Sequence, residues 1–599
     1  MNIFQIIKKQ EQNLLFGKPI KIGKYAEHDH TEKVSTITAY LNSQHISGKR
    51  DSQGREKPFL NIVIVAAYVW YKLTNISRRH IKFRAPNSKK RLKALVATLK
   101  LREWMNKKNF GQWLNKWGWT LSCYGSAVSK FIEKDGKLIP SVISWDRMIC
   151  DPVDFDGNPK IEKIYYTPAQ LRQQPYNPDR IEEAIKSFKD IRENIDGEDI
   201  DVSNEYIGVY EVHGNLPLSL LTDREEDENI YRQQMHVVFI IQNENSEDTE
   251  ISLYRGKEEK DPYVITHLLE QEGRTLSIGA VESNFDPQWM VNDMAKKTLD
   301  QFEIASKLVM QTSDPNFVGK NYLKDFDTGF VAVHEEGKPL NAMNNQSHDI
   351  PQIMSFLDLW KQQSREISGS HESVTGQTLP SGTPYRLGMM LNQEARGLFD
   401  VFRENKGLSL EYILRTHVIP HFKKTLKTTD ELVAILYGEE LEEFDKLALP
   451  ANLQKQIMLS LKKDHIPTQE EMMSIIDEEN RETNVRVITP SKGDKTWKDV
   501  FKDFEWDVEI DITGESRDKS AVITSLDTLF QRMIADPEAF GPEDRRRMMN
   551  KIIDEIGPDV ISPLQIKGIS PQGATGGESI PRGMDTGQVG MPELTEQLR

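Results

Sequence analysis

The chain has 599 residues, more than one hydrophobic core usually spans, so we expect several domains. Its formal net charge of -15 disfavours a protein that grips nucleic acid tightly, because phosphates attract basic surfaces. Its two cysteines exclude a disulfide framework and a four-thiolate zinc site. The low cysteine count fits folding in a reducing cytoplasm. No apolar run is long enough to span a bilayer, so we expect no membrane partner.

The first 285 residues mix helical and strand patterns, which favours an α+β region. Helical spacing of apolar residues predicts one helix within residues 89–114. Two β-rich runs around the turn at 134–137 predict a hairpin over residues 126–152. Further strands are predicted at 206–213 and 236–242, and an acidic, mobile insertion is expected at 190–201.

Two long helices are predicted next, over residues 286–314 and 350–368, on either side of short strand and turn signals at 315–349. The second helix has apolar residues at alternating spacings of three and four, which indicates a narrow seam against a partner helix. The seam residues are Ile350, Ile353, Leu357, Trp360 and Ile367. The preceding helix is the natural partner, so the pattern predicts an antiparallel hairpin with a small domain at its tip.

Residues 369–386 follow this hairpin, and from Ser373 to Tyr385 they carry no charged side chain. Loops of this length are usually functional or disordered. Two interpretations therefore remain open: a loop of small polar residues that faces a ligand, and a connector that contacts nothing.

The rest of the chain is mostly helical. A long helix is predicted over 387–427, weakened by Gly397 and Gly407 and broken near Pro420. Residues 428–556 are predicted to be mostly helical, with a strand hairpin within 485–513. The Gly- and Pro-rich segment 557–599 is expected to be disordered.

This order of elements resembles the portal, or head-to-tail connector, proteins of tailed bacteriophages. Three stretches are similar to the wing of such portals: WGWTLSCYGSAVSKF, VISWDRMICDP and IEKIYYTPAQLRQ. The resemblance covers most of residues 101–556. It implies a predominantly helical α+β portal fold, whose regions are the wing (1–285), the stem (286–314 and 350–368), the clip (315–349), the tunnel loop (369–386), the channel helix (387–427) and a second wing or crown region (428–556).

The resemblance also implies a function. Copies of the chain would form a ring, expected to be a dodecamer, at one capsid vertex, through which double-stranded DNA is packaged and later ejected. Implied partners are the terminase large subunit, the major capsid protein with its scaffold, and the head-completion or tail adaptor proteins. No catalysis, cofactor or metal is implied. The implied location is the virion, after assembly in the host cytoplasm.

Two sets of residues take roles from the resemblance. Uncharged side chains in the tunnel loop would contact a moving polyanion without the strong binding that several basic residues bring. The DNA-facing residues would be Ser370, His371, Ser373, Thr375, Gln377, Thr378, Ser381, Thr383 and Arg386. The clip residues that dock partner proteins would be Lys320, Lys324, Asp325, Asp327, Glu335 and Glu336.

A basic stretch lies before the first strands of the wing. Its candidate patch consists of Arg78, Arg79, Lys89, Lys90 and Arg91. The patch either contacts packaged DNA or an acidic capsid partner, or it is a solvated helix face whose basic side chains cover apolar surface.

The sequence also allows an enzyme as the alternative. In EWDVEID, strand alternation places four carboxylates on one face: Glu505, Asp507, Glu509 and Asp511. Such a group could bind Mg²⁺ in a metal-dependent nuclease, and a solvated strand face explains it equally well. DPVDFDGNPKIE does not fit a calcium loop, because Pro152 and Lys163 would fall on its first and last positions. No ATP-binding loop is present either, so any ATP hydrolysis would come from a partner.

Overall fold

The computed structural model describes most of the chain. The described residues are 2–16, 30–52, 54–85, 90–134, 136–196, 204–241, 249–306, 310–315, 335–338, 341–342, 350–369, 385–436, 440–441, 443–448, 485–488, 496–510 and 519–535, with isolated positions between 457 and 552. Of these residues 54% are helical and 20% are in strands. This composition confirms the predicted α+β class with helices predominant.

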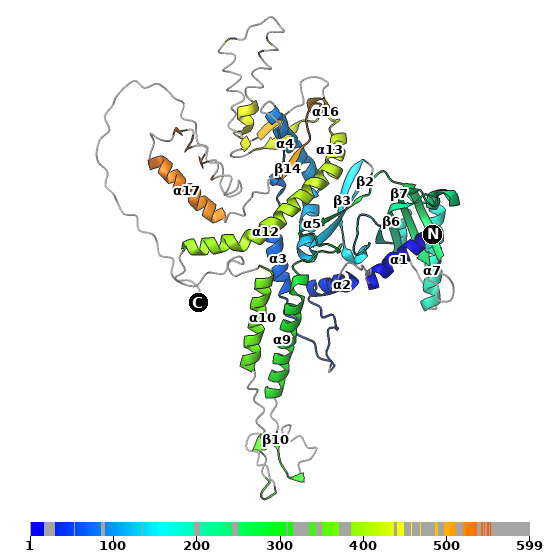
Figure 1. Cartoon of the computed structure of the whole chain (residues 1–599), viewed down its shortest axis with the longest axis vertical. Helices are drawn as coiled ribbons and strands as arrows, with labels where there is room; N and C mark the ends of the chain where they lie inside the picture. Colours follow the sequence, from blue (N-terminus) through cyan, green and yellow to red (C-terminus); the bar gives the residue numbers. More distant parts are fainter. Residues whose placement is uncertain are drawn as a thin grey trace, which may run out of the picture. The chain divides into compact units, whose positions relative to one another are not determined.

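The chain divides into two compact units. The first comprises Met1–Ile435, Glu443–Lys455 and Val485–Asp518, and the remaining residues form the second. The main described element of the second unit is α17 (Lys519–Ala535). The candidate sites all lie in the first unit, and many of its elements are labelled in Figure 1.

Five helices occupy the N-terminal part of the first unit. They are α1 (Ile3–Phe16), α2 (His30–Leu41), α3 (Val63–Leu73), α4 (Arg91–Lys107) and α5 (Phe110–Tyr124). The single helix predicted within 89–114 is wrong, because Asn109 has a left-handed backbone with φ of 53° that separates α4 from α5. Asparagine tolerates this conformation better than most residues. Gly125 ends α5 with φ of 74°, and a Cβ there would lie 2.6 Å from the carbonyl carbon of Ile278.

Two sheets lie between residues 126 and 267. The three-stranded sheet has the order β3-β2-β9, with β2 (Ser126–Lys134), β3 (Lys137–Ile143) and β9 (Tyr263–His267). The antiparallel β2–β3 pair confirms the hairpin predicted within 126–152. The five-stranded sheet has the order β4-β5-β6-β7-β8, with β4 (Met148–Ile149), β5 (Lys160–Tyr166), β6 (Ile207–Pro217), β7 (Tyr231–Ile241) and β8 (Thr249–Lys257). Strands β6 and β7 confirm the predicted strands at 206–213 and 236–242.

Helices α6 (Pro168–Arg172) and α7 (Pro178–Asp196) pack against the five-stranded sheet. Thr167 caps α6 with a capping box, in which its hydroxyl accepts a hydrogen bond from Gln170 N while the Gln170 side chain accepts one from Thr167 N. Helix α7 continues to Asp196, so residues 190–196 are helical rather than part of a mobile insertion. Short connections are made by α8 (Ser219–Thr222) and by 3-10 helices at Arg78–His80, Trp145–Arg147, Glu225–Asp227 and Glu282–Asn284.

A long helix crosses the first unit. It consists of α12 (Tyr385–Ile413), a π-helical turn (Leu414–Val418) and α13 (Ile419–Thr425). The helix continues through Pro420 instead of ending there, because the wider π turn directly before it accommodates a residue that has no N–H to donate. Helix α12 also begins at Tyr385, two residues before the predicted start.

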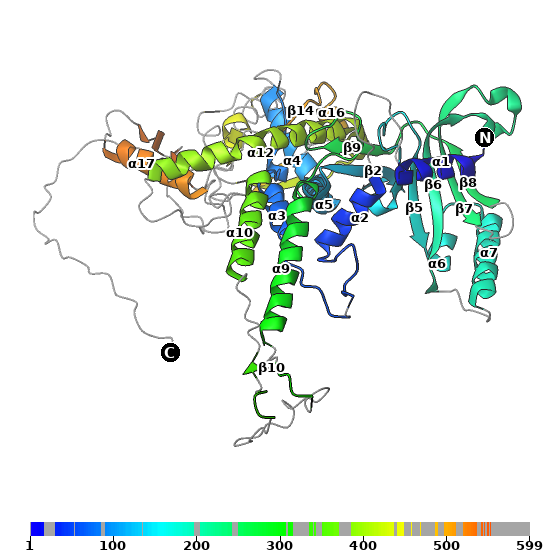
Figure 2. The same ribbon diagram turned by 60° about the horizontal axis from the view of Figure 1, so that its bottom comes forward.

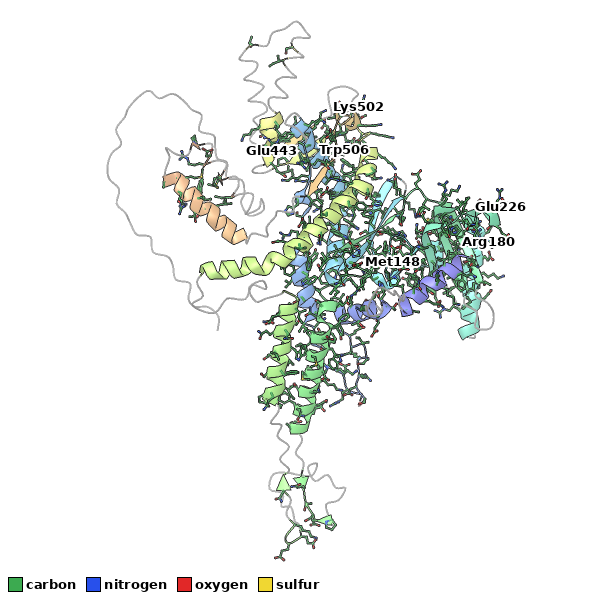
Figure 3. All side chains as sticks on the ribbon, in the orientation of Figure 1. Met148, Arg180, Glu226, Glu443, Lys502 and Trp506 are labelled. Carbon is green, nitrogen blue, oxygen red and sulfur yellow. The ribbon has the colours of Figure 1, made fainter. Side chains whose placement is uncertain are left out.

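Two small sheets join distant parts of the chain. Strand β1 (Ile81–Phe83) pairs with β14 (Val508–Ile510), and β12 (Leu432–Ile435) pairs with β13 (Val485–Ile488). The hairpin predicted within 485–513 is therefore wrong, since its two strands pair with other partners. Trp506, labelled in Figure 3, lies before β14 with ring contacts to Phe83 and Phe422, beside helix α16 (Trp497–Val500). None of the described helices is both long enough and apolar enough to cross a membrane.

Candidate functional site

The predicted helical hairpin is present. Helices α9 (Phe285–Ser306) and α10 (Ile350–Ile367) lie side by side in both views (Figures 1 and 2). They are antiparallel, because Ser364 near the end of α10 donates to Asn284 Oδ1 directly before α9, at 2.6 Å. Helix α9 ends at Ser306 rather than 314, so its length is about 33 Å at 1.5 Å per residue.

Buried polar side chains hold the root of the hairpin. Gln288 is fully buried, and its Oε1 accepts hydrogen bonds from Ile62 N at 2.9 Å and Val63 N at 3.3 Å. These N–H groups lie at the start of α3, where no helical carbonyl is available to accept them. On the α10 side of the hairpin, Trp70 Nε1 of α3 donates a hydrogen bond to Ser368 O at 2.7 Å. Helix α3 is therefore hydrogen-bonded to α9 and to the residue that follows α10.

The polar residues at the root were missed by sequence reasoning, which followed apolar spacing. Asn284, Gln288 and Asn292 recur every four residues, which places them on one face of α9 and its approach. All three are buried. The signal available in the sequence was the spacing of four residues between these uncharged polar side chains.

The apolar seam differs in part from its prediction. Leu357 and Ser364 are buried, and Ile350, Ile353 and Trp360 are half-buried. Ile367 is wrongly assigned to the seam, because it is 49% exposed, and Ser368 is the buried residue at this end. At this end of the hairpin the buried contact is therefore made by Ser368, which follows α10, and not by Ile367.

Both helices expose large apolar side chains. On α9 and α10 the exposed apolar residues are Trp289, Leu299, Phe302, Met354, Phe356, Leu359 and Ile367. At about 100° per residue, Met354 and Phe356 fall on opposite sides of the buried Leu357. Side chains surround the hairpin in Figure 3. Exposed apolar surface of this extent on a hairpin is typical of a protein interface.

Arg55, in the segment between α2 and α3, forms ion pairs with the hairpin. Its guanidinium contacts Asp300 at 2.7 Å and Glu303 at 2.5 Å, both on α9. The same group contacts Asp51 at 2.8 Å, which ties it to its own loop. One arginine with three carboxylates therefore links this loop to the outer half of α9.

The described parts of the hairpin tip bring residues 310–314 close to residues 335–342. Strand β10 (Met310–Gln311) pairs with β11 (Asn341–Ala342). Asp314 Oδ2 accepts a hydrogen bond from Glu335 N at 2.9 Å. Glu335 and Glu336 are exposed, as a docking role requires. The other predicted docking residues lie outside the described residues: Lys320, Lys324, Asp325 and Asp327.

The candidate tunnel loop is described only at its ends. Gly369 follows α10 with φ of 63°, a left-handed conformation that commonly ends helices. Residues 370–384, with the predicted DNA-facing positions from Ser370 to Thr383, lie outside the described residues. Arg386 lies in the first turn of α12 rather than in a loop, and its side chain is outside the described set.

The candidate basic patch is distributed over separate places. Lys90 contacts Glu505 at 3.2 Å, and Arg91 contacts Glu443 at 3.4 Å. Arg78 instead donates to Asn106 at the other end of α4. Lys89 and the Arg79 side chain lie outside the described residues. Two of the five basic groups thus have carboxylate partners within the protein.

The candidate nuclease carboxylates also have basic partners. Glu505 contacts Lys90, and Asp507 contacts Arg415 at 2.6 Å. Val508 and Ile510 are buried, as the strand alternation predicts. Asp511 and the Glu509 side chain lie outside the described residues. Among the residues that the structure describes, no group of three or more His, Cys, Asp or Glu side chains is arranged to hold a metal ion.

No protein-family model matches the chain, and no curated protein is similar to it.

Proposed function

We propose that this protein is a phage portal protein. Copies of the chain form a ring at one capsid vertex, and the ring is the conduit for DNA packaging and ejection. It docks the terminase motor and then the tail adaptors, and it nucleates capsid assembly. The chain acts mechanically and not as an enzyme.

The observation that carries the proposal is the α9–α10 hairpin. Its root is fixed by buried hydrogen bonds, while both helices expose large apolar side chains. A subunit in a closed ring contacts one neighbour on each side through two different surfaces. Apolar residues on both flanks of one hairpin meet that requirement better than a single patch does, because a single patch favours a two-fold dimer.

The properties of the chain also suit a conduit. A rigid root transmits load from the tip to the wing, since α3 is hydrogen-bonded to α9 and to the residue that follows α10. The net charge of -15 and the uncharged stretch from Ser373 to Tyr385 avoid strong binding to passing phosphates. The capsid protein, the adaptors and double-stranded DNA are the partners in this proposal.

The test is the assembly state of the full chain. Light scattering and negative-stain imaging are expected to find rings with a central hole, near the mass of twelve subunits. Phe302→Glu with Leu359→Glu should lower the ring fraction at least tenfold, because each places a charge in an apolar interface. Phe302→Leu with Leu359→Met is the matched control and should retain rings.

Two results would contradict the proposal. One is a protein that stays monomeric at all concentrations and also during co-assembly with its capsid protein. The other is a ring that is unchanged by the two glutamates, which would place the interface elsewhere and remove the hairpin argument.

The alternative function, a metal-dependent nuclease, gains no support from the geometry. Glu505 and Asp507 form ion pairs with Lys90 and Arg415. Asp507→Ala with Glu509→Ala separates the two functions, because a nuclease would lose turnover and a portal would keep ring formation.

A further inference from the structure

A polar hollow lies where α4 ends and α5 begins. Its volume is about 420 Å³, within the range of about 300–1,000 Å³ that is usual for small-molecule sites. Its described lining includes one arginine, Arg78, and no carboxylate. Most of the remaining polar lining is carboxamide: Asn75, Asn106, Asn109, Gln112 and Asn115. The described lining therefore carries one positive charge and no negative charge.

The guanidinium of Arg78 is held in place within this hollow. Its Nη1 donates to Asn106 Oδ1. Its flat group lies against Gly111, where a Cβ would come within 3.3 Å of Arg78 Cζ and Nε. The absence of a side chain at Gly111 therefore leaves the space that the guanidinium occupies.

The ionic environment of Arg78 differs from that of three other arginines in the first unit. Arg55, Arg91 and Arg415 each contact a carboxylate. Arg78 has no ion pair among the described residues, and its described polar contact is to a neutral amide. An exposed guanidinium fixed by neutral groups retains its full charge and several N–H donors for an external anion.

The chemistry of the lining indicates what kind of anion fits. Arginine binds phosphate through two parallel hydrogen bonds. Carboxamides both donate and accept, and they pair with the hydrogen-bonding edges of nucleobases. The volume exceeds what a bare phosphate group needs, so the carboxamides are available to the rest of the ligand.

We propose that this hollow binds a nucleoside phosphate, with Arg78 contacting the phosphate and the carboxamides contacting the base and sugar. The proposal is independent of the portal function, because all of these residues belong to one chain. The site is the same for a free nucleotide and for the phosphorylated end of a nucleic acid strand.

The experiment is calorimetric titration of the full chain with AMP. Adenosine and inorganic phosphate should each bind at least tenfold more weakly than AMP, since each lacks half of the contacts. Arg78→Gln should weaken AMP binding at least tenfold. Arg91→Gln is the matched control, because it removes the same charge at the far end of α4, about 22 Å away at 1.5 Å per residue, and should leave binding unchanged.

Further variants and probes decide the details. Gly111→Ala should weaken AMP binding severalfold, because the methyl group displaces the guanidinium. A 5′-phosphorylated oligonucleotide that competes with AMP identifies a strand end as a second source, and one that does not compete restricts the site to free nucleotides. Three results would each overturn the proposal. Free glutamate could bind as tightly as AMP, adenosine could bind as tightly as AMP, or Arg78→Gln could bind AMP with unchanged affinity.

Discussion

Two buried lysines in the first unit occupy contrasting environments. Lys130 lies between the three-stranded and the five-stranded sheet, where its Nζ contacts Glu162 at 2.8 Å and Glu211 at 2.9 Å. Lys406 of α12 is also buried, but its Nζ donates to a backbone carbonyl, Thr74 O, at 3.0 Å. It lies 5.3 Å from the centre of the Trp117 ring, and no ion pair with a carboxylate is found for it among the described residues.

The two environments move the lysine pKa in opposite directions. Burial alone lowers the pKa of Lys130, but Glu211 and Glu162 outweigh it and the pKa rises. Burial lowers the pKa of Lys406, and the charge on Arg403 adds to this effect. Together they bring the pKa to about 7. The comparison shows that the partner, and not burial itself, decides whether a buried charge is stable.

The two lysines also connect different elements of the fold. The Lys130 group joins β2 of one sheet to β5 and β6 of the other, and it extends through Glu211 to His213. Lys406 and Arg403 instead cap the C-terminal end of α3, through Thr74 O and Leu73 O. Positive groups at this end of a helix interact favourably with its dipole and carbonyls.

The largest expected effect is that of Lys130→Met. The substitution removes the lysine from both buried carboxylates and leaves Glu211 with His213 alone, which costs about 3–5 kcal/mol of unfolding free energy. Chemical denaturation followed by tryptophan fluorescence measures it. Lys107→Met is the matched control, since Lys107 is 69% exposed in its pair with Glu103 and should change stability by less than about 1 kcal/mol. Equal effects of the two substitutions would show that the buried network is not a stabilising unit.

Lys406→Met should change the free energy of unfolding less than Lys130→Met does near pH 7, and the change should depend on pH. The folded pKa of about 7 lies below the unfolded value of 10.5, so the unfolded chain binds more protons between these values. Stability contributed by this group therefore rises with pH from about 7 to 10.5, by up to about 1.4 kcal/mol per pH unit. The Met variant should lack this rise, as measured by the difference between the two proteins in denaturation midpoints at pH 7, 8 and 9. A parallel pH dependence in both proteins would contradict the assignment.

His213 provides the smallest of the three effects. Burial lowers its pKa, but hydrogen bonds to Glu211 at 2.7 Å and Glu258 at 2.9 Å outweigh this and raise it above 6.5. Its stabilising charge is fully present below pH 6.5 and is lost as pH rises through the folded pKa. His213→Gln should remove this loss, because the variant carries no charge to lose over this pH range. Thermal denaturation between pH 6 and 9 checks it, and a wild-type protein with no excess loss over the variant would refute it.

Glu211 extends the same group to acidic pH. Burial raises its pKa, but His213 and Lys130 outweigh this and lower the pKa to about 2. Its contribution is therefore present above pH 4.5 and is lost as pH falls toward 2. His213 and Glu211 together place the greatest stability of this network between about pH 4.5 and 6.5.

Local sequence patterns predicted the elements whose signals repeat within one helix or hairpin. The turn at 134–137 placed β2 and β3. Seam spacing placed α10 beside α9, although Ile367 proved exposed. These features follow from neighbouring residues, because turn, cap and helical spacing act over a few positions.

Local patterns failed where a boundary depended on one unusual residue or a distant contact. Asn109 divides a region that apolar spacing alone predicts as one helix. Strands β13 and β14 carry strand-like sequence, but their partners are β12 and β1, far away in the chain. Strand propensity identifies a strand and does not specify its partner.

The sequence by itself determined the α+β composition, the helical hairpin, and an uncharged stretch beside it. Only the tertiary structure decided which charges are neutralised: Lys90 meets Glu505 across 415 residues, whereas Lys406 is buried against carbonyls and an aromatic ring. The physical reason is range, since helical and strand periods are written in adjacent residues. The partner of a charge depends on how distant segments pack together, and that packing sets its pKa and its contribution to stability.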